Sequence, residues 1–172
     1  AISSLALSAE SRACSIESSL SFRLCKITFQ PNFLKMKNTI ERGAVRKFAE
    51  AIGDPAPIYL DEKAGADSKF GRNIAAPTFP VTFDAGTIPE LKLPAKGLIH
   101  GEQIYHYTRP LFVGEDVYCW MEVKDYYEKS GGFGEMGFLV MTKYGEDAEG
   151  ELLFTEERIV IINEAARKEM PV

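Results

Sequence analysis

The second half of the chain contains four long segments of strand character joined by short turns, and this pattern restricts the fold more than any other feature. After Gly97, "LIHGEQIYHYTRP" is followed by "DVYCWMEVKDYYE", which is rich in aromatic and β-branched residues. The turn at 130–134 leads to "EMGFLVMTKY", and the turn at 145–150 leads to "ELLFTEERIVII". Loops of this length connect consecutive antiparallel strands, so we expect an antiparallel sheet. The polar tail "NEAARKEMPV" is expected to fray.

The segment before the sheet is expected to be mainly helical. In "ERGAVRKFAEAIGD" apolar residues recur at helical spacing, and these are Val45, Phe48, Ala49 and Ile52. Gly53 occupies the position of a left-handed C-terminal cap, and Pro55 prevents the helix from continuing. Asp54, Pro55 and Pro57 then predict a stiff extended loop, and a short helix is expected from about residue 61 to Lys69.

"AAPTFPVTFDAGTIPEL" predicts a buried helix. Thr78 is a suitable N-cap, Pro80 fits a first turn, and Pro89 ends the element. Apolar residues surround most of its circumference, and these are Phe79, Val81, Phe83, Ala85 and Ile88. A helix that is apolar nearly all round is normally buried. The expected fold is therefore α+β, with a curled antiparallel sheet around a central buried helix.

Length and composition indicate one protein domain with an ordinary core. The chain has 172 residues and a net charge of −5, which argues against a nucleic-acid partner. No apolar run approaches the roughly 18–20 residues that cross a bilayer. The three cysteines (Cys14, Cys25 and Cys119) and two histidines (His100 and His106) show no disulfide or metal-ligand spacing. We therefore expect no metal, no cofactor and a reducing, cytoplasmic setting.

Residues 1–35 differ from the rest of the chain. They contain eight serines between Ser3 and Ser21, whereas all 14 glycines follow Met36. We interpret them as an atypical Ser-rich extension, either poorly ordered or an artefact of the reading frame. A targeting peptide is the alternative, although Glu10 and Glu17 weigh against it. Residues 36–172 are expected to form the single domain.

Three stretches in this order resemble the MaoC-like hotdog dehydratases, most closely the N-terminal, non-catalytic FAS1-like dehydratase domain. They are "FAEAIGDPAPIYLDE", "AAPTFPVTF" and "HGEQIYHYTRPLFVGEDV", and the resemblance covers about residues 38–162. It implies a hotdog fold and dimers in which two sheets join edge to edge. It also implies the reversible addition of water to a trans-2-enoyl thioester of coenzyme A or acyl carrier protein.

Catalytic members of this family resemble one another in an aspartate followed five residues later by a histidine, and in a His-Gly pair that opens the buried helix. The histidine and carboxylate move the protons of a water, and a backbone N–H stabilises the enolate. Asp54 matches the aspartate, but Tyr59 stands in place of the histidine. "APTFP" replaces the His-Gly pair, and Pro80 has no N–H. The resemblance therefore implies a degenerate catalytic site.

Other roles stay open for these residues. Asp54 would also serve to cap a turn, and Tyr59 would serve as a packing residue. His100 and Glu102 are expected to share one strand face, with His106 further along it, because side chains alternate. They form either a replacement acid–base pair or, for His100, a hydrogen-bonded interface residue.

Substrate-binding candidates come from the buried helix and from the loop after the first long strand. Thr78, Phe79, Val81 and Phe83 are expected to line an acyl groove or to form plain core. Arg109 and Lys96 are either solvated cations or contacts for the phosphates of a pantetheine-bearing carrier.

Three functions remain as hypotheses. The first is a substrate-binding, non-catalytic subunit of an acyl-thioester hydratase or 3-hydroxyacyl dehydratase, paired with a catalytic hotdog chain. The second is a self-sufficient homodimeric dehydratase or thioesterase that uses Asp54 or Glu102 with His100. The third is a non-catalytic acyl-CoA-binding protein.

Overall fold

The computed structural model describes residues 34–88, 91–132 and 134–169. The Ser-rich extension to residue 33, with Cys14 and Cys25, and Pro89 lie outside this range. Within it, no helix is long and apolar enough to cross a membrane.

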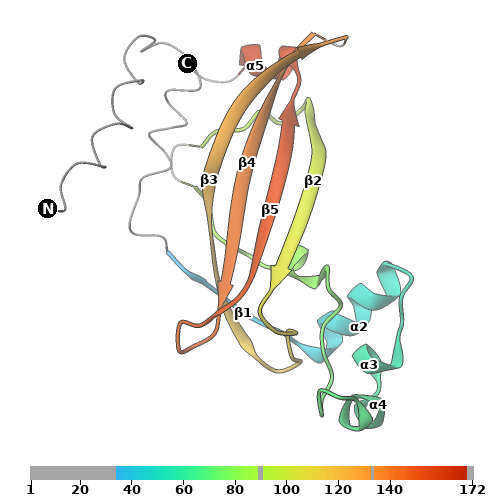
Figure 1. Cartoon of the computed structure of the whole chain (residues 1–172). Helices are drawn as coiled ribbons and strands as arrows, with labels where there is room; N and C mark the ends of the chain where they lie inside the picture. The colour runs from blue at the N-terminus through green and yellow to red at the C-terminus, as the bar shows by residue number, and fades with distance from the viewer. Residues whose placement is uncertain (1–33, 89–90, 133, 170–172) are drawn as a thin grey trace, which may run out of the picture.

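A five-stranded antiparallel sheet forms the body of the domain (Figure 1). The strand order is β1-β3-β4-β5-β2, and the strands are β1 (Met36–Thr39), β2 (Leu98–Tyr107), β3 (Asp116–Gly131), β4 (Gly134–Glu146) and β5 (Leu152–Ile162). The four long strands and the two hairpins that join β3, β4 and β5 confirm the sequence prediction. The short, polar β1, which pairs with β3, was not predicted.

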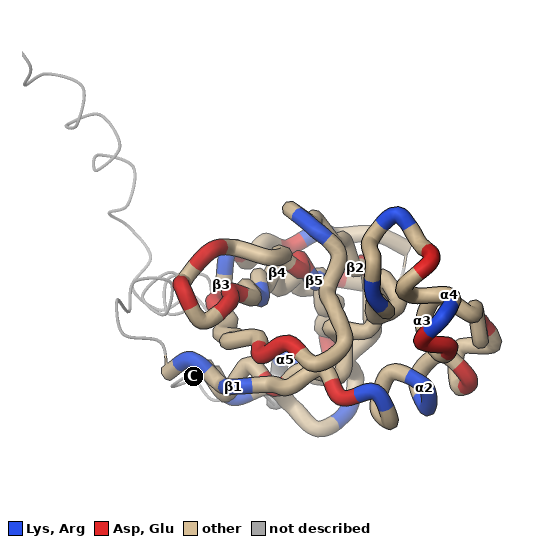
Figure 2. Tube along the Cα trace, turned by 90° about the horizontal axis from the view of Figure 1, so that it is seen from below, with Lys and Arg blue, Asp and Glu red and all other residues tan. Residues whose placement is uncertain are grey.

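Three helices gather at one end of the sheet (Figures 1 and 2): α2 (Arg42–Ala51), α3 (Pro57–Leu60) and α4 (Glu62–Asp67). In α2, Val45 and Ala49 are fully buried as predicted, but Ile52 is 47% exposed because it is the C-cap and not part of the helical face. Gly53 has a φ of 74°, which confirms the left-handed cap. The predicted extended loop is wrong at Pro57, which starts α3 at a position where no N–H is needed.

The central helix is much shorter than predicted. Only the single 3-10 turn η2 (Phe79–Thr82) forms, and the chain is extended at Phe83. Beyond it, the backbone N–H and C=O of Asp84 bond to the Asn38 side chain, each at 2.8 Å, which ties this segment to β1. An N–H held by a side chain is not available to extend the helix.

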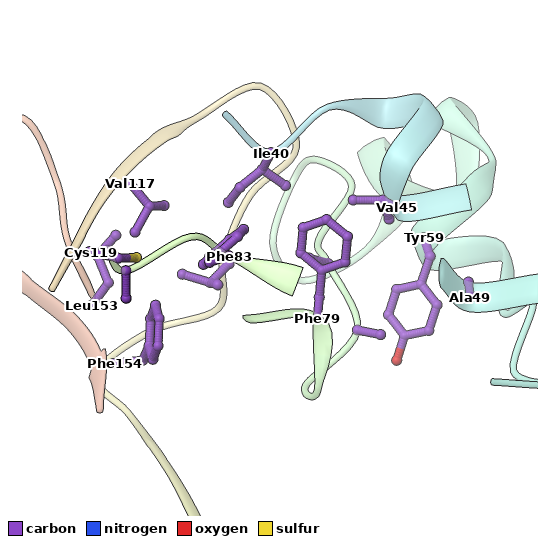
Figure 3. Close-up of a cluster of buried hydrophobic side chains, with 14 residues drawn as sticks. Ile40, Val45, Ala49, Tyr59, Phe79, Phe83, Val117, Cys119, Leu153 and Phe154 are labelled. Carbon is purple, nitrogen blue, oxygen red and sulfur yellow. The ribbon is translucent and has the colours of Figure 1, made fainter. Parts of the chain in front are cut away.

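The buried side chains form two clusters. The first joins the helical end to the sheet and includes Phe79 of η2, the following Phe83 and Phe154 of β5 (Figure 3). In the second, Ile88 and the half-buried Leu91 and Leu93 pack against β3, β4 and β5. An extended segment therefore covers the part of the sheet that the predicted helix was expected to cover.

The C-terminal end folds back as a short helix, α5 (Glu164–Glu169), so the prediction of a frayed tail is wrong there. The Asn163 side chain caps this helix by accepting a hydrogen bond from the N–H of Ala166 at 2.8 Å. Ala166 is 3% exposed and belongs to the second cluster. Burial of one small apolar side chain and a good cap hold the helix against the sheet.

Asn73 holds the helical end together. Its side chain is buried and donates to the carbonyl oxygens of Ile58 and Asp61 at 2.8 and 2.7 Å. Its own oxygen accepts from Arg42 at 3.1 Å. A Cβ at Gly65 would lie 2.6 Å from Asn73, so only glycine fits beside it. One amide thus fixes both ends of α3 and joins α3 to the start of α2.

Replacing Asn73 with alanine tests this tie. Two carbonyl oxygens would lose their donor, and an unsatisfied buried group costs about 1–3 kcal/mol. We expect Asn73→Ala to lower the free energy of unfolding by about 2–4 kcal/mol in urea titrations. The matched control is Asn163→Ala, which removes a cap worth about 1 kcal/mol. Equal losses in the two variants would contradict the assignment.

Candidate functional site

Asp54 and Tyr59 lie on the loop and helix that follow α2. The backbone N–H of Asp54 bonds to Ala49 at the end of α2, and its carboxylate is exposed. Tyr59 is 9% exposed and belongs to the first core cluster, with its hydroxyl pointing out of that cluster (Figure 3). Burial, and then the negative charge of Asp54, raise the pKa of Tyr59 above its ordinary value of 10.0. The phenol is therefore neutral at pH 7 and has no capacity to act as a base.

The opening of η2 offers few donors to an oxyanion. The N–H of Phe79 bonds to Ala76, the N–H of Val81 bonds to Thr78, and Pro80 has none. The Thr78 side chain makes no capping bond, so the prediction of a side-chain N-cap is wrong although its position is right. An oxyanion hole requires free donors aimed at one point. In the described residues 79–81 the structure provides none.

His100 and Glu102 do not form an acid–base pair. A β-bulge at Gly101 shifts the register, so that His100 lies opposite Val160 and Glu102 lies opposite Ile159. Neighbouring residues of β5 point to opposite faces of the sheet, and so do the side chains opposite them. His106, opposite Thr155, shares the face of Glu102. The prediction that His100 and Glu102 share a face is therefore wrong, because it assumed an unbroken alternation.

The predicted groove residues of η2 lie mostly in the core. Phe79 and Phe83 are 2% and 7% exposed and pack edge-to-face with ring centroids 5.5 Å apart. Val81 is exposed, and none of the three lines a described pocket. The alternative interpretation, plain core, thus holds for Phe79 and Phe83.

A pocket of about 440 Å³ lies between the segment that leads into η2 and the end of β2. Its lining is mainly apolar and includes Ala75, Ala76, Pro77, Tyr107 and Leu111. The Tyr107 hydroxyl donates to the Pro77 carbonyl at 2.6 Å, which ties the two walls together next to Thr78. Of the sequence-predicted substrate residues, only Arg109 lines the pocket. The volume lies in the range of small-molecule sites.

Two charged residues that the sequence analysis missed fix η2 to the sheet. Lys143 and Glu156 are 7% and 1% exposed, and their charged atoms lie 3.0 Å apart. The Lys143 ammonium donates to the Pro80 carbonyl at 2.9 Å. Glu156 also accepts from Gln103 of β2 at 2.7 Å. The sequence did contain a signal for the burial of Lys143. Alternation along β4 places this residue on the same face as the apolar Leu139, which is fully buried.

Across the described ranges, no group of three or more His, Cys, Asp or Glu residues is arranged to hold a metal ion. Cys119 is buried in β3, as its apolar surroundings in the sequence indicated. Burial raises the pKa of its thiol to about 12, so it is not a nucleophile at neutral pH.

An antiparallel sheet curled around a short central helical turn is the hotdog fold, which the solved MaoC-like dehydratase of Rhodospirillum rubrum shares. A family model described as "FAS1-like, dehydratase domain region" matches residues 30–156. This is more than half of the chain, and the protein belongs to that family.

Individual relatives agree with this assignment. A UPF0336 protein of Thermobifida fusca is 37% identical over 92 residues, which are 50% of this chain and 60% of the relative. The chain spans little more than half the length of several curated relatives that it matches.

Solved structures show the same fold. The ChsH1–ChsH2 complex of Mycobacterium tuberculosis has a TM-score of 0.67 at 19% identity, over 82% of this chain and 89% of that chain. An (R)-hydratase from A. caviae involved in PHA biosynthesis has a TM-score of 0.58 at 25% identity, over 75% of this chain and 92% of that chain.

The coupling between Asp54 and Tyr59 predicts a specific alkaline titration. Because the folded pKa of Tyr59 is raised, its contribution to stability is present below about pH 10 and is lost as the pH rises through the folded pKa. In Asp54→Asn the opposing negative charge is removed, and the Tyr59 pKa is expected to fall towards its ordinary value. Tyrosinate absorbance, with and without Tyr59→Phe, measures this pKa. Glu50→Gln on α2 is the control, and an equal shift in both carboxylate variants would contradict the coupling.

Proposed function

We propose that this chain is the substrate-binding, non-catalytic subunit of an acyl-thioester hydratase or 3-hydroxyacyl dehydratase. The single observation that carries the proposal is Tyr59, a buried, neutral phenol where proton transfer requires a group that titrates near neutral pH. The absence of free donors at residues 79–81 of η2 supports it independently. Membership of a dehydratase family supports the substrate class.

In this proposal the chain binds and orients the substrate, and a second hotdog chain supplies the acid–base pair and the oxyanion donor. The apolar pocket beside Thr78 receives part of the substrate. Asp54 is exposed and forms no hydrogen bond or ion pair with a described side chain, so its carboxylate is open to a partner or a ligand. We place this activity in the cytoplasm.

The outer edge of β2, which among the described residues pairs with no strand besides β5, is the proposed contact with the partner chain. β2 is the last strand of the sheet, and its residues 98–102 are all exposed. A long, exposed edge strand is a template for pairing with another strand. One structural neighbour is by name a complex of two proteins, ChsH1 and ChsH2, which supports pairing with a different chain.

A charge on this edge is expected to prevent association. Ile99 is 49% exposed on β2, and Ile99→Lys introduces a charge of the kind that blocks edge pairing. We expect the variant to sediment as a monomer under conditions in which the wild-type chain is a dimer. Leu152→Lys is the matched control, because Leu152 is 41% exposed at the start of β5, at the opposite end of the β2–β5 pair from Ile99. A dimer that survives Ile99→Lys but not Leu152→Lys would place the interface elsewhere.

The activity itself is tested with the purified chain. We expect it to bind a saturated acyl-CoA, measured by calorimetry, but to leave the absorbance of a short trans-2-enoyl-CoA unchanged. Turnover that is abolished by Asp54→Asn would overturn the non-catalytic assignment, because another group would then replace the missing histidine. Binding without turnover, and without any gain when a catalytic hotdog chain is added, would favour an acyl-CoA-binding protein instead.

A further inference from the structure

One face of the sheet carries an apolar band formed by Tyr127, Phe138, Ile161 and Ile99. Each of the first three is adjacent in its strand to a residue of the second buried cluster, and adjacent strand residues point to opposite faces. The band therefore lies on the outer face of the sheet, away from the core. The helices that the structure describes lie elsewhere, because α2, α3 and α4 gather at one end of the sheet (Figure 1) and α5 packs into the second cluster.

The band is continuous across four strands. Tyr127 of β3 lies opposite Phe138 of β4, and the two rings stack with their centroids 5.0 Å apart. Phe138 in turn lies opposite Ile161 of β5, and Ile161 lies opposite Ile99 of β2. Ile99 is 49% exposed and the other three are half-buried. A contiguous exposed patch of this kind normally marks an interaction surface.

Two opposite charges flank the band on β3. Asp125 lies two residues before Tyr127 and Lys129 lies two residues after it, so all three side chains are on the outer face. The Lys129 ammonium lies 5.1 Å from the centre of the Tyr127 ring and 5.4 Å from that of Phe138. Asp125 and Lys129 are exposed, and neither forms an ion pair with a residue that the structure describes. Both charges are thus available to another molecule that covers the band.

The positions of these charges fit a second copy of the same face. A copy turned over about an axis along the band lays band against band and exchanges the two flanks. Each Lys129 then faces the partner's Asp125. Rotation about an axis along the strands would instead set Asp125 against the partner's Glu102, because these two residues lie in one row at opposite sides of the sheet. Charge complementarity therefore selects the first arrangement.

We propose that the outer face of the sheet binds a second copy of this chain, with the two bands packed together and two Lys129–Asp125 pairs across the interface. This surface is separate from the edge pairing of the proposed function, which stands if the face pairing fails. Ile99 ends the band at the β2 edge. Edge pairing about an axis perpendicular to the sheet keeps both outer faces on one side, so it joins two bands into one longer surface. The expected assembly is two edge-paired units packed face to face.

Charge exchange on β3, far from the β2 edge, tests the proposal by sedimentation at low ionic strength. We expect the mass of the edge-paired unit to double as the full chain is concentrated from about 5 to about 500 μM. Asp125→Lys sets cation against cation at both flanks, and Lys129→Asp sets carboxylate against carboxylate. Each variant alone should require an about tenfold higher concentration for doubling. An equimolar mixture of the two variants restores opposite charges and should double within about threefold of the wild-type concentration.

Lys63→Asp is the matched control, since Lys63 is an exposed lysine of α4 and the substitution changes the net charge as Lys129→Asp does. It should double in mass as the wild type does. A wild-type mass that stays constant, or a doubling that neither β3 variant weakens, would overturn the proposal. A mixture that associates no better than the single variants would also overturn it, because the opposite charges would then not face each other.

Hydroxyl-radical labelling of Phe138 identifies what covers the band. In the proposed assembly, labelling falls as the mass doubles. Labelling that is low at every concentration, without doubling, would show that a segment of the same chain covers the band and would overturn the proposal.

Discussion

The buried ammonium of Lys143 joins the sheet to the segment that carries the candidate site. It is 7% exposed, donates to the carbonyl of Pro80, the second residue of η2, and lies 3.0 Å from Glu156. A one-turn helix has too few internal hydrogen bonds to be stable alone. The sheet therefore supplies the partner that further helical turns would have supplied.

Burial of the Glu156 carboxylate costs free energy, and the groups around it offset this cost. A buried carboxylate is destabilising unless its partners are in place, and removing one member of such a pair typically costs about 3–5 kcal/mol. Glu156 has three partners: Lys143, Gln103 of β2 and Arg158, the last at 2.6 Å. Because Gln103 lies on the edge strand, the network connects η2 with the edge at which a partner chain is proposed to pair.

The fold was predictable where a local pattern decided it. The long strands and the cap at Gly53 follow from alternation, turn residues and backbone freedom, which are properties of neighbouring residues. The length of η2 was not predictable, because a side chain 46 positions away, Asn38, holds the Asp84 backbone. The bulge at Gly101 reversed the face of His100 for a similar reason: one extra residue in β2 has no signature in the alternation itself.

For the candidate site as well, single residues could be identified from one stretch of sequence, whereas the arrangement of the site depends on segments that are distant in the sequence. The resemblance within one stretch placed Tyr59 where catalytic members have a histidine. A phenol is neutral at pH 7 because its ordinary pKa is 10.0, and burial raises that pKa further. The pocket required two segments that meet only in space, residues 69–77 and 107–111. In the proposed site a neutral phenol stands where proton transfer would need a base, and an apolar pocket lies nearby, so these residues are suited to binding and not to proton transfer. The proposal that another chain supplies the chemistry follows from that combination of residues, and not from the fold alone.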